Sequence, residues 1–446
     1  MKYSSRRSGL ILDFLKFKSC RYKTIRLATI FVTTSLLVSQ SSSPVVAALE
    51  DSPKTIVDEV WQIVNSEFVD REFNHVDWKI KRQELLRGQY TDQKTAYKAI
   101  RKSLKDLGDP YTRFLNPEEY EELTSQTSGE LSGIGIRLGI DQKTSKLIVV
   151  EPIPNSPASE AGLKAGDHIV SVNGKSTKLM TLEQASAEIK GEVGTEVILE
   201  ISRSEKPAFD VTIARAQIEL PSVSYTLNQE QDSKVGYIKL DEFSSHAAEQ
   251  MEKAIQELSA KQASGFILDL RGNPGGLLFS SVEIARMWME KGAIVSTIDR
   301  KGGNQKFSAN GKALTNLPLV VLVDGYSASA SEILAGALKE NHRAKVVGSR
   351  TYGKGTVQSV HALSDGSGLA VTIARYYPPS GIDINKKGIS PDVKVDLSRE
   401  EQTTLSVNPD LIGTKADRQY SRAIAILKNE SISKTGGDLS PAVTTR

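Results

Sequence analysis

Ser329 is the first candidate nucleophile in the sequence, because it stands where a buried strand meets a helix. The apolar run 319–323 predicts the strand, and the pattern over 331–339 predicts the helix. A hydroxyl at such a junction can be exposed, and backbone N–H groups at the helix start can hold a developing oxyanion. The stretch Ser-Ala-Ser-Glu that ends at Glu332 equally fits a capping box, in which the hydroxyl satisfies a free N–H. This segment alone leaves both readings open.

A serine nucleophile needs a base, and no sequence motif identifies one of the histidines as that base. None of the five stands in a known triad motif, and there is no G-x-S-x-G elbow, so we assign each a structural role. Lys354 lies between Gly353 and Gly355, which allow other segments to approach the amine closely. Burial disfavours an ammonium and can bring its pKa from about 10.4 towards about 7–8. Most lysines are solvated, so Lys354 by itself is only a candidate base.

The N-terminal segment reads as a secretory signal. The formal net charge of +3 depends on it, because residues 1–48 hold eight basic residues and one acid, and the rest of the chain is slightly acidic. No basic surplus is left to neutralise phosphates, which argues against nucleic acid as a partner. The apolar run 27–39 is too short to span a bilayer and leads to a small-residue cleavage site at Ala47-Ala48. We expect export and no membrane span after cleavage; an uncleaved anchor is the alternative.

Composition also limits the chemistry of the mature protein. Cys20, the single cysteine, lies within the signal, so no disulfide, zinc thiolate or cysteine nucleophile is expected afterwards. We expect no metal and no cofactor.

The spacing of apolar residues changes along the chain and predicts an α/β multidomain protein. Apolar residues at helical spacing predict an N-terminal helical domain, and short strands between glycine turns predict a small β-rich module. Strands then alternate with helices, as in an α/β core, and the end of the chain is polar and only partly patterned. We assign a signal peptide (1–48), the helical domain (52–127), the β-rich module (128–216), the α/β core (217–397) and a C-terminal tail (398–446).

The β-rich module carries a candidate site for a peptide terminus. Gly133-Ile134-Gly135-Ile136 places two glycines at the start of an expected strand, 133–138, where N–H groups can converge on a carboxylate. The edge of that strand can also accept a peptide as an added strand. The order of the segments that follow, up to Gly174, resembles a PDZ domain, which implies that the partner is a protein C-terminus.

The segments around Ser329 and Lys354, taken together, resemble the carboxy-terminal processing peptidases. The likeness runs from Asp109-Pro110-Tyr111 to about Pro391 and is greatest to the cyanobacterial and plastid members that process the photosystem II reaction-centre precursor. It implies a crotonase/ClpP-like α/β protease core with an inserted PDZ domain. It also implies a serine endopeptidase with a Ser–Lys dyad that removes C-terminal extensions in the thylakoid lumen or periplasm.

The resemblance also assigns roles to individual residues. It makes Ser329 and Lys354 the dyad, with Glu332 and Gln358 as supporting residues and Gln358 as a hydrogen-bond partner of the lysine. It gives the oxyanion donors as the N–H groups of Ala330 and Gly275. In some relatives a basic PDZ residue senses bound substrate, and Lys190 falls at a similar place. Some bacterial members carry an aspartate near the position of Glu340, which we therefore leave without a catalytic role.

Two other functions stay open on the sequence alone. One is a binding protein, with a PDZ scaffold on an inactive protease-like core. The other is a hydratase or thioesterase that recognises coenzyme A, since the superfold does not fix function. The PDZ insertion argues against the second. The physiological substrate, the cleavage site and the oligomeric state are not specified by these patterns.

Overall fold

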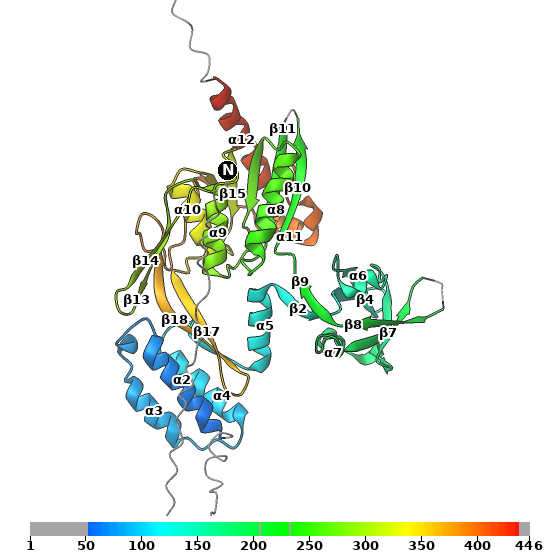
Figure 1. Ribbon diagram of the computed structural model, residues 1–446, viewed down its shortest axis with the longest axis vertical. Helices are drawn as coiled ribbons and strands as arrows, with labels where there is room; N and C mark the ends of the chain where they lie inside the picture. The colour runs from blue at the N-terminus through cyan, green and yellow to red at the C-terminus, as the bar shows by residue number, and fades with distance from the viewer. Residues whose placement is uncertain (1–51, 205–206, 232, 437–446) are drawn as a thin grey trace, which may run out of the picture. The chain divides into compact units, whose positions relative to one another are not determined.

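The computed structural model describes residues 52–204, 207–231 and 233–436 (Figure 1). The expected signal peptide, 1–48, lies outside these ranges. Within them, no helix combines the length and the apolar character that crossing a membrane would need.

A six-stranded sheet forms the α/β core, in the order β10-β11-β12-β15-β16-β19. The β10–β11 pair is antiparallel, and the other four neighbouring pairs are parallel. The five residues of β12 and those of β15 are all buried, which explains why both appear in the sequence as continuous apolar runs. The strands are β10 (Val223–Glu230), β11 (Ser233–Leu240), β12 (Gly265–Asp269), β15 (Leu319–Val323), β16 (Lys345–Gly348) and β19 (Val393–Lys394).

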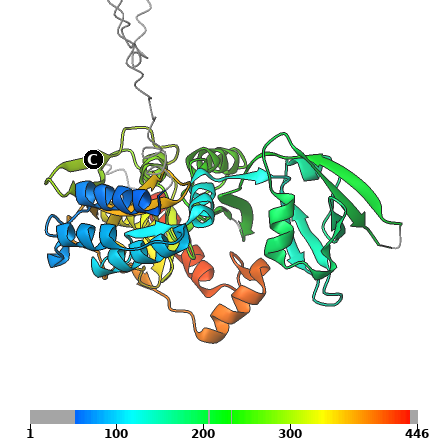
Figure 2. The same cartoon turned by 90° about the horizontal axis from the view of Figure 1, so that it is seen from below.

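Alternate side chains of this sheet enter two different cores. On one face Ile238, Leu268 and Val321 pack with three helices, and on the other face Tyr237 and Ile267 pack with a fourth. Figure 2 shows the green helices and the orange-red C-terminal segment on opposite sides of the core. The helices are α8 (Ala247–Ala260), α9 (Leu278–Trp288) and α10 (Ala330–Glu340) on the first face and α12 (Arg418–Gly436) on the second.

The C-terminal region differs from the sequence-based expectation of a tail over 398–446. It forms α11 (Arg399–Val407), η3 (Pro409–Leu411) and α12. Tyr420 and Leu427 of α12 are buried in the second core. Their apolar surface is removed from water, and burial of this kind holds a helix in place.

The N-terminal helices pack on a second sheet. Val57, Val64 and Ile100 share a core with Leu369 and Val371 of β18, so a helical layer covers one face of that sheet. A further helix, α5 (Pro117–Ser128), begins with a capping box between Asn116 and Glu119. The elements are α2 (Pro53–Glu67), η1 (Phe73–His75), α3 (Trp78–Arg87), α4 (Gln93–Asp106), β1 (Arg113–Leu115), β13 (Ala293–Asp299), β14 (Asn304–Ser308), β17 (Thr356–Ala362) and β18 (Gly368–Tyr377).

The β-rich module has its own sheet and core. Its strands are ordered β3-β4-β5-β7-β8, with β6 on β5, so β3 lies at an edge. The sequence predicted one strand over 133–138; instead β2 ends at Gly133 and β3 begins at Ile136, with Gly135 between them at φ 81°. The elements are β2 (Glu130–Gly133), β3 (Ile136–Ile140), β4 (Leu147–Pro152), α6 (Pro157–Glu160), β5 (His168–Val172), β6 (Lys175–Ser176), η2 (Thr177–Leu179), α7 (Leu182–Ile189), β7 (Glu196–Ser202), β8 (Phe209–Ala214) and β9 (Ala216–Glu219).

Candidate active site

Two adjacent parallel strands bring the candidate nucleophile and base to one edge of the core sheet. Val323, at the end of β15, pairs with Gly348, at the end of β16. Ser329 and Lys354 each follow six residues after those paired positions. Carboxyl ends of neighbouring parallel strands meet at the same sheet edge, which is where α/β proteins usually bind ligands. The topology therefore explains how residues 25 positions apart come together.

Ser329 has a strained backbone immediately before α10. Its φ is 55° and its ψ is −112°. This conformation costs a non-glycine residue about 1–3 kcal/mol, so it persists only where the surrounding structure holds it. The Glu332 N–H donates to the Ser329 carbonyl oxygen at 2.9 Å. Ser329 and Glu332 have the capping-box arrangement at the start of α10. The capping role that the sequence left open is therefore present in the structure, and it does not by itself exclude a role of the hydroxyl as nucleophile.

Asp324 and Asn273 hold the turn that precedes Ser329. Asp324 Oδ1 accepts the N–H of Ser327 at 3.0 Å and that of Gly272, in the neighbouring loop, at 3.1 Å. The Asn273 carbonyl oxygen accepts the N–H of Ala328 at 3.1 Å. Asn273 is itself fully buried. These bonds tie the turn to the glycine loop 272–276.

Glu332 joins the Ser329 segment to the Lys354 segment. Its Oε1 accepts the Thr351 hydroxyl at 2.6 Å and the Gly353 N–H at 2.7 Å. Its Oε2 accepts the N–H of Ser329 and that of Lys354, each at 2.9 Å. Burial raises the pKa of Glu332, and the four hydrogen bonds that its carboxylate accepts oppose that rise. One buried side chain thus fixes the backbone at both candidate positions.

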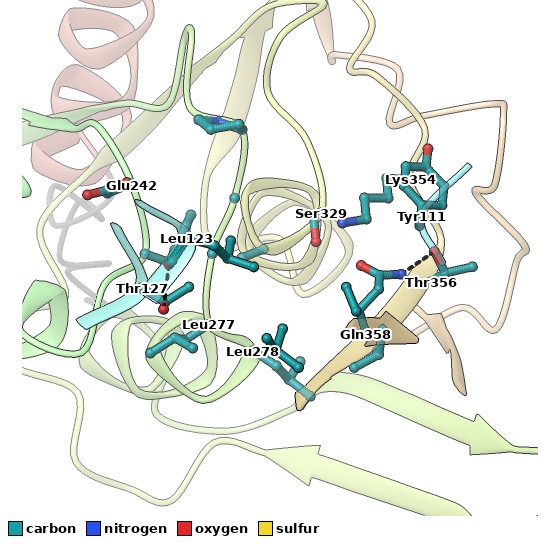
Figure 3. A pocket seen from close by; sticks show the side chains of 18 of the residues that line it. Tyr111, Leu123, Thr127, Glu242, Leu277, Leu278, Ser329, Lys354, Thr356 and Gln358 are labelled. Atoms are coloured by element: carbon teal, nitrogen blue, oxygen red, sulfur yellow. Dashed lines mark hydrogen bonds between the residues drawn. The ribbon is translucent and has the colours of Figure 1, made fainter. Parts of the chain in front are cut away.

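Lys354 has the environment that general-base chemistry requires. Desolvation by burial is the largest cause that lowers its pKa, the charge of Arg113 is the next, and together they bring the pKa to about 8. The charges of Asp109 and Glu332 act in the opposite direction. The ammonium nitrogen lies 4.9 Å from the centre of the Tyr111 ring, in a cation–π contact. Figure 3 shows the Ser329 hydroxyl and the Lys354 amine pointing towards each other.

Gln358 lines the same cavity, but it does not bond to the lysine as the resemblance led us to expect. Its amide nitrogen donates to the hydroxyls of Thr356 at 2.9 Å and Thr372 at 3.3 Å. These bonds leave the amide oxygen on the side of Ser329 and Lys354 (Figure 3). The placement of Gln358 is therefore fixed by its neighbours in β17 and β18.

Gly275, one of the two expected oxyanion donors, approaches Ser329 and Ala330 closely. A Cβ on Gly275 would come within 2.9 Å of Ser329 Cβ and 3.1 Å of the Ala330 nitrogen, so only glycine fits at this close approach. Its φ of 109° also favours glycine. The Gly275 N–H donates to Asn273 Oδ1 at 2.8 Å. In this conformation the side chain of Asn273 occupies that donor.

A cleft of about 340 Å³ contains Ser329 and Lys354 in its wall. Figure 3 shows Leu123, Leu277 and Leu278 among the side chains that line it. Apart from Lys354, its charged lining residues are Arg113 and Glu242. A mostly apolar cleft with few polar groups suits a peptide segment whose orientation is set by those groups.

The four residues expected at the PDZ groove have different roles in the structure. Ile136 starts the edge strand β3, whereas Gly133 ends β2 and is paired with Ala216. Ile134 is buried in the core of the module. Gly135 accepts the hydroxyl of Ser156 through its carbonyl oxygen at 3.1 Å. Among the described strands β3 pairs only with β4, so its other edge is unpaired.

Lys190 is an exposed residue at the C-terminal end of α7, where its N–H donates to the Ser186 carbonyl oxygen at 2.9 Å. It is not among the residues that line the cleft with Ser329. The structure does not bring Lys190 into the same cavity as the candidate dyad.

Five residues of the site were not assigned a role from sequence. Tyr111 lies within a segment that supports the family resemblance, and the spacing of Asp324 and Ser327 is typical of an Asx turn, so both carried a usable signal. Asn273 and Thr351 carried none, because their placement depends on contacts with distant segments. Among the described residues, no group of three or more His, Cys, Asp or Glu side chains is arranged to hold a metal ion.

Comparison with known proteins connects this geometry to a family. The model of peptidase family S41 matches residues 234–395, and the model of the PDZ domain matches residues 148–203. A carboxyl-terminal-processing protease of Synechocystis sp. is 40% identical over 393 residues, which cover 88% of this chain and 90% of the relative. The chain belongs to peptidase family S41.

Other members of the family agree with this assignment. Carboxyl-terminal-processing peptidase 3 of Arabidopsis thaliana, described as chloroplastic, is 38% identical over 79% of this chain and 71% of its own length. The solved photosystem II D1 C-terminal processing protease has a TM-score of 0.51 and 36% identity, and the match covers 82% of this chain and 98% of that chain. The S41 chain is therefore a serine-type C-terminal-processing peptidase with a mixed α/β protease domain, a PDZ domain and a helical N-terminal region.

Proposed function

We propose that Ser329 and Lys354 form a Ser–Lys dyad that cleaves peptide bonds. The observation that carries this proposal is the shared carboxylate of Glu332, which accepts the N–H of both residues at 2.9 Å and so sets their backbones relative to each other. The pKa of Lys354, lowered to about 8, gives the amine an appreciable neutral fraction near neutral pH. The capping box at the start of α10 is compatible with this proposal, because a hydroxyl that accepts a helix N–H can still donate its proton to the Lys354 amine, towards which it points (Figure 3).

The chemistry follows from these groups. Neutral Lys354 takes the proton from Ser329 Oγ as that oxygen attacks the scissile carbonyl carbon. The ammonium then gives the proton to the leaving amine, which departs as the new N-terminus and leaves an acyl-enzyme on Ser329. Lys354 next takes a proton from a water molecule, which attacks the ester carbonyl; the C–Oγ bond breaks, the ammonium returns the proton to Ser329 Oγ, and the new C-terminus leaves as a carboxylic acid.

Backbone N–H groups stabilise the oxyanion in both steps. The Ala330 N–H belongs to the first residue of α10, and Gly275 lies so close that a Cβ on it would be 3.1 Å from the Ala330 nitrogen. Because Asn273 Oδ1 accepts the Gly275 N–H at 2.8 Å, oxyanion formation has to replace that bond or share the donor. In this mechanism Asn273 keeps the polar N–H satisfied until substrate arrives.

We also propose that the PDZ domain captures the C-terminus of the protein substrate along the edge of β3, with Gly133, Ile134, Gly135 and Ile136 at the start of the groove. Strand addition would present an extended chain to the cleft. The substrates that fit this reading are exported proteins with accessible C-termini, among them the photosystem II reaction-centre precursor. The expected signal peptide and the relatives support a location in the thylakoid lumen or the periplasm.

Mass spectrometry of exported proteins and of the reaction-centre precursor tests the proposal. After incubation with the wild type, substrates should lose a C-terminal segment, and Ser329→Ala and Lys354→Ala should leave them intact while remaining folded. The same trimming by Ser329→Ala would contradict the dyad. Binding of the substrate C-terminus without trimming by the wild type would instead support the PDZ scaffold reading.

A further inference from the structure

Glu242 is an unusual residue in the cleft that contains Ser329 and Lys354. It is the one carboxylate side chain among the described residues that line this cleft; the other charged lining residues are Arg113 and Lys354. The Glu242 carboxylate is half-buried, and within the described part of the chain it accepts no hydrogen bond and forms no ion pair. A partly desolvated charge without a partner is unfavourable, so an incoming cation would gain from pairing with it.

The backbone next to Glu242 is fastened to the loop that carries the oxyanion donor. The Phe243 N–H donates to the Gly275 carbonyl oxygen at 2.9 Å, and the Leu277 N–H donates to the Phe243 carbonyl oxygen at 2.8 Å. Phe243 is fully buried, and a Cβ on Gly276 would lie only 2.4 Å from its carbonyl oxygen. The backbone that carries Glu242 is therefore fixed beside the glycine loop in the cleft wall.

Figure 3 shows Glu242 and Lys354 on opposite sides of the view, with Ser329 next to Lys354. The groups that shift the pKa of Lys354 are Arg113, Asp109 and Glu332, and Glu242 is not one of them. Glu242 is thus not the counter-ion of the catalytic amine. Its carboxylate remains available to a group that enters the cleft.

The surroundings strengthen the attraction of this carboxylate for a cation. Burial is the main cause that raises the pKa of Glu242, and the neighbouring negative charge of Asp241 is the second. Apolar side chains such as Phe243 and Leu278 lower the local dielectric constant, in which charges interact more strongly than in water. The same carboxylate would repel an acidic side chain of a peptide.

We propose that Glu242 is a specificity-determining residue that binds a lysine or arginine side chain of the peptide substrate close to the scissile bond. This inference rests on the proposed function of the cleft as a peptidase site and specifies the class of peptide that it prefers. A lysine or arginine side chain is long enough to leave an extended backbone in the cleft and still reach the wall. A pair formed in a partly desolvated cleft contributes more than one at the surface.

A peptide series tests the proposal with purified full-length protein. Each peptide carries lysine, glutamine or glutamate at one of the four positions on either side of the cleaved bond, and kcat/KM is measured for each. For the wild type we expect one position at which lysine exceeds glutamine about tenfold, with glutamate lower than glutamine. In Glu242→Gln the lysine-to-glutamine ratio should fall to about one, and Glu242→Lys should favour glutamate instead.

Asp241→Asn is the matched control, because it removes the same charge from the adjacent residue, which does not line the cleft. It should keep the preference for lysine, and circular dichroism should show that all three variants are folded. A wild type that cleaves the peptides with equal kcat/KM at every position overturns the role of Glu242. So does a preference that survives in Glu242→Gln. A wild type that cleaves none of the peptides or protein substrates contradicts the proposed function itself.

Discussion

Ser329 and Lys354 donate their backbone N–H groups to the same oxygen, Glu332 Oε2, each at 2.9 Å. The two residues belong to segments that follow different strands, so their relative position depends on this shared acceptor. The other oxygen of Glu332 holds Thr351 and Gly353. Glu332 is fully buried, so water cannot replace any of these bonds.

Replacement of Glu332 by glutamine should therefore abolish most of the activity and weaken the fold. The amide nitrogen of glutamine would replace one carboxylate oxygen and would face the two donors that now bond to that oxygen. Hydrogen bonds to a charged group are worth about 1.5–3 kcal/mol each. We expect kcat to fall by at least about 100-fold and the free energy of unfolding to fall by about 2 kcal/mol. Peptide cleavage assays and urea denaturation measure the two effects.

Glu340→Gln is the matched control for this variant. Glu340 accepts the N–H and the hydroxyl of Ser380 at 2.7 and 3.0 Å, and it does not line the cleft. Its conversion to glutamine should leave kcat within about twofold of the wild type. An equal loss of activity in both variants would show that the effect of Glu332 is not local to the dyad.

The pH dependence of cleavage should follow the ionisation of Lys354. The base must be neutral, and its pKa is lowered to about 8. Since the neutral amine dominates above the pKa, kcat/KM should rise with pH, reach half its maximum near pH 8 and level off above. At pH 7 about one tenth of the amine is neutral. A profile measured from pH 6 to 10 that stays flat, or that falls above pH 7, would argue against Lys354 as base.

Arg113 should shift the midpoint of that profile. Its positive charge is the second cause, after burial, that lowers the pKa of Lys354. Arg113→Gln removes the repulsion between the two cations, so the midpoint should move to higher pH and activity at pH 7 should decrease. Arg137→Gln, in the PDZ domain and paired with Glu151, removes the same charge outside the cleft and should not move the midpoint. An unchanged midpoint in Arg113→Gln would exclude this electrostatic role.

Gly275→Ala should inactivate the enzyme by closing the oxyanion position. The new methyl group would lie 2.8 Å from the Ala328 carbonyl oxygen and 2.9 Å from Ser329 Cβ. Loss of one oxyanion donor lowers kcat by about 10²–10³-fold, and we expect a decrease of that size. Steady-state kinetics on one peptide substrate measure it.

Gly272 offers a control in the same loop. Its φ of 76° is also unfavourable for alanine, but nothing lies within 4 Å of the added Cβ. Gly272→Ala should therefore lose about 1–2 kcal/mol of stability and keep most of its kcat at temperatures where it is folded. If both alanine variants lose activity to the same extent, backbone strain rather than the oxyanion position explains the loss.

The sequence predicted the elements that carry the strongest patterns. The continuous apolar run of β15 and the helix after Ser329 match the structure closely. Residues 356–362 carry no clear strand pattern in the sequence, because β17 is half-buried along most of its length and lacks a regular alternation of apolar and polar residues. Gln358 lies on this strand, and its bonds to Thr356 and Thr372 depend on pairing with β18.

The hydrogen bond from the Gly275 N–H to the Asn273 side chain also could not be predicted from the sequence. The glycine loop 272–276 can be recognised in the sequence as a turn. Whether the Gly275 N–H is hydrogen-bonded depends on the side-chain conformation of Asn273, which distant contacts fix. Asn273 donates its side-chain amide to the Leu240 carbonyl oxygen at 2.8 Å, and this bond fixes which way its oxygen points. Residue types and spacing identify the candidates, whereas the state of the donor depends on the packed core.

The C-terminal helix was missed although its signal is present. Tyr420, Ala423, Ile424 and Leu427 follow the spacing of one helical face, but the surrounding composition is polar and concealed it. Tyr420 is fully buried, and its hydroxyl bonds to Asn228 at 2.9 Å and Glu230 at 3.1 Å. The face that contains it covers the second side of the core sheet.

Tyr420→Ala should therefore destabilise the core, although the residue is far from the active site in sequence. Removal of a fully buried aromatic side chain costs about 3–5 kcal/mol, whereas Tyr420→Phe keeps the ring and loses only its hydroxyl bonds, at about 1 kcal/mol. Urea denaturation of the two variants and the wild type gives these differences. If residues 418–436 were a loose tail, both variants would unfold at the wild-type urea concentration. A large loss in Tyr420→Ala alone shows that the ring packed on the sheet is part of the folded protease domain.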